Sequence, residues 1–296
     1  MIQRRDIDGI LLFDKHSGTN FLFDEVYVDQ PCLAPRHVSI ALTTSCNFAC
    51  VHCYIIHDNK QLYLSRVKEW VDVLCKNGCL SIGLGGGEPT IWKDIVELCK
   101  HIGSTEMALT LTTNGSADVS FYRELMQYVN LLRFSIDGLS DVYESYRKQS
   151  YINTIGKIAK LREANAKIGI NYLLTDKTVE QLDMFLQLIY DMQPSEILLI
   201  PCLTKMGEET LSWQAKKRVK NWVAKNQGRI PLAFSYSSIN MVSNFALPIQ
   251  DFTPQKQKHY FLHINAYGNI MKSVFDDKPI RIGNSLTNAL KKIKGD

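Results

Sequence analysis

The sequence has no apolar run of the roughly 18 residues that a membrane-spanning helix needs. Its amino terminus, MIQRRDIDGI, also lacks the apolar core of a signal peptide. These two absences predict a cytoplasmic protein. Because the cytosol is reducing, its eight cysteines are not expected to form a disulfide framework, and clustered cysteines indicate a metal or redox site.

The sequence also lacks a concentrated block of basic residues. The 34 Lys and Arg residues, set against 30 Asp and Glu residues, are spread along the chain. Proteins dedicated to nucleic-acid binding normally carry a basic stripe. We therefore expect neither a nucleic acid nor a membrane among the partners.

No internal repeat or long linker divides the chain, and strand-like and helix-like segments alternate from about residue 38. Six strand-like segments are each followed by a helix-like segment. The strands are expected at 37–43, 79–84, 107–112, 131–137, 168–174 and 196–201. Such a series predicts an α/β protein with a parallel sheet, either doubly wound or curled into a partial barrel. In both cases the reactive site belongs at the carboxyl ends of the strands.

Two extensions flank this body. Residues 10–24 contain two strand-like runs around a Ser-Gly turn and predict a β-hairpin. Residues 259–275 contain two strand-like runs separated by Asn-Ala-Tyr-Gly, and a short helix is expected at 285–293. The predicted regions are an amino-terminal arm at 1–36, a core at 37–228 and a carboxyl-terminal extension at 229–296.

Three cysteines lie within eight residues, directly after the first predicted strand. They are Cys46, Cys50 and Cys53, spaced C-x3-C-x2-C without a fourth cysteine nearby. Structural zinc normally takes four ligands, for which His52 and His57 are the available fourth candidates. A [4Fe–4S] cluster held by three thiolates instead leaves one iron for an external ligand. The spacing alone leaves both the zinc site and the cluster open.

Two more motifs follow the next two strands, and a third lies at the end of the fourth strand. They are Gly85-Gly86-Gly87-Glu88-Pro89, Thr113-Asn114-Gly115 and Ser135-Ile136-Asp137-Gly138. Because carboxyl ends of parallel strands share one edge of a sheet, these motifs and the cysteines are expected to lie together. The glycines Gly85 to Gly87 would let the backbone come close to a ligand. Asp137 is expected to cap the helix that follows it.

These residues resemble a known family. CNFACVHCY, residues 46–54, resembles the cysteine signature of radical S-adenosylmethionine (SAM) enzymes, with His52 at the usually aromatic position. GGEP, TNG and SIDG match, in order, further motifs of the branch that contains peptide maturases and sulfatase-maturating enzymes. The resemblance covers about residues 35–205. It implies a partial (β/α)6 TIM-like barrel, with a short amino-terminal hairpin and a carboxyl-terminal β-hairpin and helix extension.

The resemblance also implies the cofactors. Cys46, Cys50 and Cys53 would hold one [4Fe–4S] cluster, and SAM would bind its fourth iron. Reduction would cleave SAM to a 5′-deoxyadenosyl radical that abstracts hydrogen from the substrate. An electron donor such as flavodoxin or ferredoxin is the implied partner. The implied SAM-binding residues are His52, Tyr54, Gly86, Gly87, Glu88, Pro89, Thr113, Asn114, Ser135 and Arg147.

Two of these residues receive a specific role from the resemblance. Ser135 is expected to form a hydrogen bond with the ribose or the carboxylate of SAM. Arg147 is expected to pair with the SAM carboxylate, for which a planar guanidinium is well shaped. His52 is expected to pack against the cysteine loop or the adenine.

The chain departs from this branch near its carboxyl end. Many maturases carry a cysteine-rich extension there, with auxiliary iron–sulfur clusters. Residues 263–284 resemble its beginning, but Ser273 stands about where the cysteine would be and no cysteine follows Cys202. Auxiliary clusters are therefore not expected. Cys202 follows a predicted strand, so it is a candidate donor of a hydrogen atom to a substrate radical, as in radical peptide epimerases.

Three functions are compatible with the sequence. The first is modification of a peptide, as in a maturase or an epimerase, with the amino-terminal hairpin either accepting a leader peptide as an added strand or docking on its own barrel. The second is a reaction on a small metabolite, because the missing auxiliary domain leaves a more compact entrance. The third is a non-catalytic metal-binding protein, which predicts bound zinc and no SAM binding.

Overall fold

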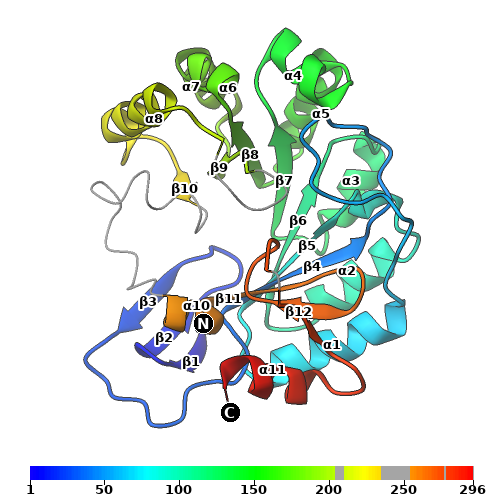
Figure 1. Ribbon diagram of the computed structural model, residues 1–296, viewed down its shortest axis with the longest axis vertical. Helices are drawn as coiled ribbons and strands as arrows, with labels where there is room; N and C mark the ends of the chain where they lie inside the picture. Colours follow the sequence, from blue (N-terminus) through cyan, green and yellow to red (C-terminus); the bar gives the residue numbers. More distant parts are fainter. Residues whose placement is uncertain (204–209, 235–253, 277, 296) are drawn as a thin grey trace.

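The computed structural model describes residues 1–203, 210–234, 254–276 and 278–295, which form a large curved sheet, a small sheet and surrounding helices (Figure 1). The strands of the large sheet are β4 (His37–Thr43), β5 (Ser81–Gly86), β6 (Ala108–Thr113), β7 (Leu131–Ile136), β8 (Ile168–Leu174), β9 (Glu196–Pro201), β10 (Leu232–Phe234), β11 (Phe261–Ile264), β12 (Asn269–Met271) and β13 (Ile280–Arg281). The α-helices are α1 (Leu64–Lys76), α2 (Ile95–Gly103), α3 (Val119–Leu125), α4 (Ser140–Arg147), α5 (Tyr151–Glu163), α6 (Asp176–Glu180), α7 (Leu182–Met192), α8 (Trp213–Asn226), α10 (Pro254–Tyr260) and α11 (Leu286–Lys294).

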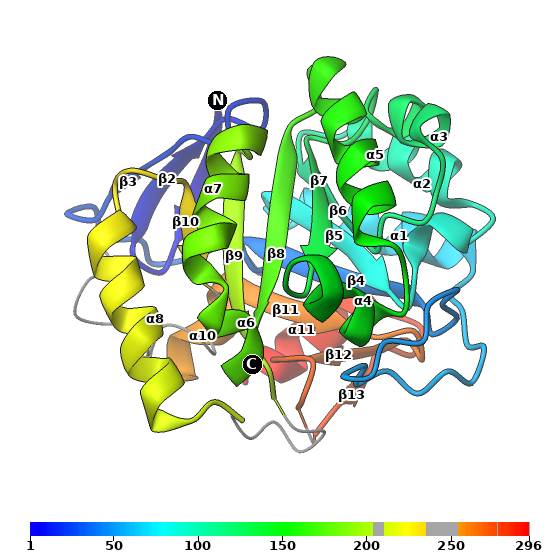
Figure 2. The same cartoon turned by 90° about the horizontal axis from the view of Figure 1, so that it is seen from above.

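The large sheet has the strand order β10-β9-β8-β7-β6-β5-β4-β11-β12-β13 in the described part of the chain. Every neighbouring pair from β10 to β11 is parallel, and only β12 and β13 are antiparallel to their neighbours. The sheet curves, and helices that connect its strands lie along its outer side (Figures 1 and 2). The six predicted strand and helix units are confirmed, as is the open, partial barrel.

The alternation of residues along the strands explains which side of the sheet faces the helices. In β4, Val38, Ile40 and Leu42 are fully buried in the core that the sheet shares with the outer helices. The intervening His37 and Ser39 point to the opposite, concave side, since successive side chains of a strand face opposite ways. The outer side is therefore apolar and the concave side more polar.

The carboxyl-terminal segment contributes strands to the same sheet. β10 pairs with β9, and β11 pairs with β4. The predicted hairpin at 259–275 is confirmed as β11 and β12, which are antiparallel. It forms part of the large sheet because β11 is parallel to β4. The division of the chain at residues 36 and 228 stays a prediction.

The amino-terminal arm forms a three-stranded antiparallel sheet from β1 (Ile2–Asp6), β2 (Gly9–Phe13) and β3 (Asn20–Phe23). The predicted hairpin is confirmed as β2 and β3, while β1 was not predicted. The buried Arg4 side chain forms an ion pair with Asp6 and donates to the carbonyl of Ala34, which fixes β1 to the core.

The tip of this arm lies at the amino ends of the barrel strands. The Lys15 ammonium donates to the Thr105 carbonyl, and the Asn130 amide donates to the Lys15 carbonyl. Thr105 precedes β6 and Asn130 precedes β7. The arm is thus docked on its own barrel, at the end opposite to the predicted site. In the described ranges, no helix combines the length and apolar character that crossing a membrane requires.

The contact between β11 and β4 leads to a prediction about how the free energy of unfolding depends on pH. His263 on β11 is buried, and its Nδ1 lies 2.6 Å from the Ser39 hydroxyl of β4. Burial lowers the pKa of His263 to about 4 from 6.5. Below pH 6.5 the unfolded chain therefore takes up a proton that the folded chain does not, so the free energy of unfolding falls as the pH drops. The expected loss from this residue is about 3 kcal/mol at pH 4.

Urea unfolding at pH 7 and at pH 4.5 tests this expectation. A His263→Gln variant should lose less stability between the two pH values than the unchanged protein. A His16→Gln variant serves as the control, because His16 is exposed. Equal losses in all three proteins would show that His263 makes no contribution to acid sensitivity.

Candidate active site at the carboxyl ends of the strands

The three cysteines lie on one loop that leaves β4 and returns to α1. The loop is closed at its base, since Thr44 N donates to the Lys60 carbonyl at 2.8 Å and a bridge joins Thr43 to Gln61. Cys46, Cys50 and Cys53 are all free thiols and all partly buried. Within the ranges that the structure describes, no three His, Cys, Asp or Glu side chains converge closely enough to hold a single metal ion.

The surroundings of Cys46 and Cys50 raise the pKa of both thiols and so favour protonated sulfur until a metal displaces the proton. Burial raises the pKa of Cys50 to about 11, although the nearby Arg147 cation acts in the opposite direction. Burial also raises the pKa of Cys46. Two donors already face the Cys46 sulfur: Phe48 N at 3.4 Å and the side-chain amide of Asn114 at 3.7 Å. Such donors stabilise a thiolate, so a cysteine–metal bond would be supported at this position.

The glycine-rich motif holds the start of the cysteine loop. Gly87 N donates to the Thr43 carbonyl at 2.7 Å, and Glu88 N donates to the Ser45 carbonyl at 2.9 Å. A Cβ at Gly86 would lie 2.4 Å from the Thr43 oxygen, and a Cβ at Gly87 would lie 2.1 Å from the Ser45 oxygen. The backbone that comes close to these two glycines is therefore the protein's own. Their proposed contact with SAM stays a prediction.

The glycines give a prediction with an internal control. A Gly87→Ala change forces the strand end away from Ser45 and should lower the free energy of unfolding by about 1–3 kcal/mol. It should also weaken retention of iron, because the cysteine loop loses its anchor. A Gly85→Ala change should leave both unchanged, since a Cβ there meets nothing within 4 Å. Urea unfolding and iron content measure the two effects, and equal behaviour of the variants would contradict this role of Gly87.

Glu88 joins the glycine motif to the TNG motif. The side chain is fully buried, and its Oε1 accepts from Thr90 and from the Thr113 hydroxyl at 2.8 Å. Its Oε2 accepts from Asn114 N at 2.7 Å. Burial raises the pKa of Glu88, and these hydrogen bonds oppose the rise. Both oxygens thus have protein donors, so Glu88 organises the strand ends, and its predicted contact with SAM has no support from these bonds.

Other residues of the GGEP and TNG motifs also have defined structural roles. The hydroxyl of Thr113 also lies 2.8 Å from the buried Tyr122 hydroxyl. Pro89 begins a short 3-10 helix, Pro89–Ile91. The Asn114 side chain reaches the cysteine loop, donating to Asn47 Oδ1 at 2.9 Å in addition to Cys46. Asn114 thus links the TNG motif directly to the cysteine loop.

A buried charge network forms under the cysteine loop. Asp137 Oδ2 lies 2.9 Å from His52 Nε2 and 2.5 Å from Arg147 Nε. The prediction that Asp137 caps the next helix was wrong, because Leu139 occupies the cap position without a side-chain bond. The Asp137 carboxylate instead points inward, where it contacts the His52 imidazole and the Arg147 guanidinium. Arg147 was predicted to pair with the SAM carboxylate, but here it pairs with a carboxylate of the protein.

The network also shifts the pKa of Asp137. Burial would raise the pKa of Asp137, but the Arg147 cation and His52 hold it below its ordinary value. The His52 ring packs edge-on against Tyr146, with centroids 5.6 Å apart. His52 Nδ1 is buried and has no hydrogen-bond partner in the described structure. The sequence did not reveal the contact between His52 and Asp137. The expected packing of His52 against the cysteine loop or the adenine stays a prediction.

The remaining predicted residues surround the same edge of the sheet. Ser135 is half-buried near the end of β7, two residues before Asp137. Tyr54 is half-exposed and its ring lies 5.3 Å from that of Phe275 in the carboxyl-terminal segment. Cys202 follows β9, and its backbone N donates to the Leu174 carbonyl at 2.9 Å. Their contacts with a cofactor or substrate stay predictions.

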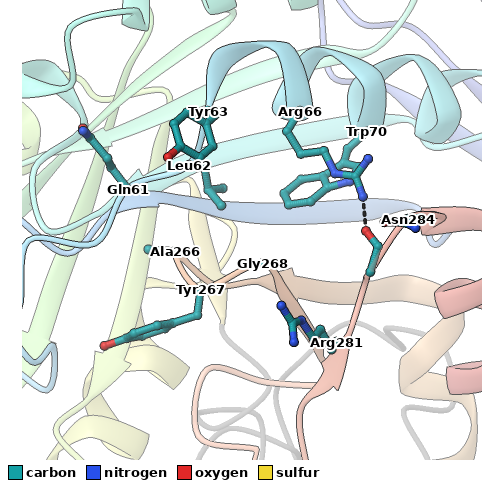
Figure 3. Close-up of a pocket in the computed structure, with 11 residues that line it drawn as sticks. Gln61, Leu62, Tyr63, Arg66, Trp70, Ala266, Tyr267, Gly268, Arg281 and Asn284 are labelled. Atoms are coloured by element: carbon teal, nitrogen blue, oxygen red, sulfur yellow. Dashed lines mark hydrogen bonds between the residues drawn. The ribbon is translucent and has the colours of Figure 1, made fainter.

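Two cavities border the cysteine loop. One of about 350 Å³ is lined by Asn47, Thr90 and Ser116, which neighbour the cysteine, GGEP and TNG motifs. A second, of about 620 Å³, lies between the start of α1 and the β11–β12 turn (Figure 3). The second contains none of the predicted site residues. The Tyr267 hydroxyl on its border donates to Asp58 at 2.8 Å, which ties the carboxyl-terminal hairpin to the cysteine loop.

Curated relatives resemble part of the chain. Mycofactocin maturase MftC of Mycolicibacterium smegmatis is 30% identical over 163 residues, which are 51% of this chain and 41% of that protein. Fe-coproporphyrin III synthase of Methanosarcina barkeri is 23% identical over 64% of this chain and 51% of its own length. GTP 3′,8-cyclase of Clostridium perfringens is 28% identical over 47% of this chain and 47% of its own length. The chain spans about half the length of these relatives.

Solved structures share the fold. SuiB of Streptococcus suis superposes with a TM-score of 0.76 at 14% identity, covering 100% of this chain and 89% of that one. The structure of anSMEcpe with bound AdoMet and a Cp18Cys peptide superposes with a TM-score of 0.66 at 17% identity, covering 87% and 80%. The family profile described as the Radical SAM superfamily matches residues 40–189, just over half of the chain. Since that match includes the cysteine loop and the three motif-bearing strands beside it, the chain belongs to the radical SAM superfamily.

Proposed function

We propose that this chain is a radical SAM enzyme that binds one [4Fe–4S] cluster and SAM at the cysteine loop and modifies a peptide. The observation that carries the proposal is the loop itself: three free thiols are anchored by the GGEP and TNG motifs at the carboxyl edge of the parallel sheet. In a [4Fe–4S] cluster each thiolate binds a different iron, so three cysteines on one loop are a suitable donor set. The three sulfur atoms therefore do not need to converge on a single metal ion.

The chain's own residues supply positioning and electrostatics around the proposed cofactors. The bound cluster would supply an electron that cleaves SAM and so yields the 5′-deoxyadenosyl radical for hydrogen abstraction. Phe48 N and Asn114 donate to the Cys46 sulfur, which supports its charged form. The Asp137–Arg147 pair lies close enough to Cys50 to influence its pKa. These contacts would hold the loop in one arrangement during the proposed reaction.

A peptide is the substrate class that the comparisons favour. The relative MftC is a maturase, and SuiB has been solved bound to a precursor peptide, SuiA. A small metabolite is the second candidate, because relatives also include a GTP cyclase and a synthase of Fe-coproporphyrin III. An electron donor such as flavodoxin or ferredoxin and a hydrogen-donor role for Cys202 remain predictions.

Anaerobic reconstitution tests the proposal. The protein is loaded with iron and sulfide, both are quantified, and dithionite and SAM are added. Formation of 5′-deoxyadenosine is the expected result. Bound zinc in place of iron, with no 5′-deoxyadenosine, would favour the non-catalytic metal-binding protein and contradict both enzymatic functions.

A further inference from the structure

The larger of the two cavities, of about 620 Å³, lies between α1 and the carboxyl-terminal strands (Figure 3). One wall is the start of α1, with Tyr63 and Arg66. The opposite wall is formed by the β11–β12 turn and β13, with Tyr267 and Arg281. The volume is typical of small-molecule sites, which range over roughly 300–1,000 Å³. We call this space the α1–β13 cavity.

Protein contacts hold the two walls of the cavity together. The Arg66 guanidinium donates to the Gly283 carbonyl, which joins α1 to the segment after β13 (Figure 3). The same guanidinium lies over the Trp70 ring, 5.7 Å from its centroid. Ile282 N donates to the Gly268 carbonyl at 3.2 Å and so holds the end of β13 against the turn. Because these contacts shape the cavity in advance, a ligand would need to order few protein groups on binding.

The lining of the cavity is cationic. Among its eleven residues two are Arg, and none is Asp or Glu. Arg66 also pairs with Glu69 at 2.7 Å, whereas the exposed Arg281 side chain has no ion pair or hydrogen bond in the described structure. The first turn of α1 contains no acidic residue, and the Tyr63 side chain does not cap it, so the positive end of the helix dipole adds to these cations. The cavity should therefore attract an anion, for which a guanidinium offers two parallel hydrogen bonds.

The cavity also presents accessible aromatic side chains. Tyr63 is 80% exposed and Tyr267 is 49% exposed, so a ligand from solution can reach both rings. The Tyr267 hydroxyl donates to Asp58 at 2.8 Å, which fixes the position of that ring. Exposed aromatic rings gain most from contact with another flat ring, because stacking buries their apolar faces. The lining thus favours a ligand that combines a flat aromatic body with an anionic group.

From this lining we infer that the α1–β13 cavity binds a small aromatic anion, either a carboxylate or a phosphate ester. Arg281 contacts the anionic group, and Tyr63 contacts the aromatic body. The inference goes beyond the proposed function, because no residue of the cysteine, GGEP, TNG or SIDG motif lines this cavity.

Equilibrium dialysis with matched probes tests the inference. The purified protein is dialysed at low ionic strength against naphthoate, naphthyl phosphate or the uncharged naphthamide. At least one of the two anions should bind about tenfold more tightly than naphthamide, a difference of roughly 1.4 kcal/mol. The anion that binds more tightly identifies the anionic group as a carboxylate or a phosphate. Added salt should reduce the preference for the anion, because exposed charges are screened.

Two variants separate the anionic contact from the aromatic contact. Arg281→Gln should weaken binding of the preferred anion by about tenfold and leave binding of naphthamide unchanged. Tyr63→Ala should weaken binding of the anion and of naphthamide by the same factor, about threefold. Both side chains are exposed, so urea unfolding of the two variants should match that of the unchanged protein. Arg123→Gln is the control, because Arg123 is exposed on α3 and does not line the cavity.

Several outcomes would overturn the inference. They are equal affinities for the anions and naphthamide, no binding of any probe, and an anion affinity that Arg281→Gln or Tyr63→Ala leaves unchanged. The same loss in Arg123→Gln as in Arg281→Gln would also overturn it, since the attraction would then come from the net charge of the protein. SAM takes no part in these measurements, so their result does not depend on whether 5′-deoxyadenosine forms.

Discussion

A Cys50→Ala variant is expected to retain little iron after reconstitution and to form 5′-deoxyadenosine at least about 100-fold more slowly than the unchanged protein. Loss of a residue that only orients a metal ligand costs roughly 10–100-fold in metal affinity or activity, so loss of a ligand itself should cost more. Iron and sulfide content and the rate of product formation measure the effect.

The matched control is Cys75→Ala. Cys75 is a half-buried free thiol on α1, outside the cysteine loop. Its removal should leave iron content and SAM cleavage close to those of the unchanged protein. If Cys50→Ala kept full iron content and activity, the cluster would have to bind elsewhere and the proposed function would fail at its central point.

Among the single variants proposed here, Asp137→Ala should lower the free energy of unfolding the most. It removes the carboxylate that neutralises Arg147, a residue that is only 8% exposed. Removing one partner of a buried ion pair typically costs about 3–5 kcal/mol, because the other charge stays buried without compensation. The His52 contact is lost at the same time, so the cysteine loop should also hold iron less firmly.

An Asp72→Ala variant provides the comparison. Asp72 lies 2.8 Å from His101, but this pair is at the surface and should contribute about 1 kcal/mol or less. Urea unfolding of both variants at pH 7 measures the difference. Equal losses of stability would mean that Arg147 finds another partner or water, and that Asp137 does not organise the loop.

The sequence was sufficient for those features that have a local pattern. The six core strands alternate or form apolar runs, and each is followed by helical spacing, so their order and parallel pairing could be predicted. The four motifs were placed at one edge because each lies at, or directly after, the carboxyl end of a strand. The pairing of β11 with β4 had no such signal, since Ile264 and Ile40 are neighbours only in space.

Residue roles at the site were harder to predict than residue positions. A Gly-Gly-Glu-Pro motif indicates that another group comes close to the glycine backbone. It does not indicate whether that group is a ligand or, as here, the protein's own Ser45 backbone. Glu88 is a typical ligand by residue type, and only the structure shows that Thr113 and Asn114 use both of its oxygens. Asp137 likewise finds His52, which is 85 residues earlier in the chain.

The position of β11 beside β4 has a consequence for folding during synthesis. β4 carries the cysteine loop at its end, and one of its edges is paired with β5 soon after both have left the ribosome. In the described part of the chain, the other edge pairs with residues 261–264, which are made more than 200 residues later. Until then the nascent chain exposes an unpaired strand edge, which is a template for aggregation. A chain that stops before residue 261 should therefore be aggregation-prone even though all six predicted strand and helix units are present.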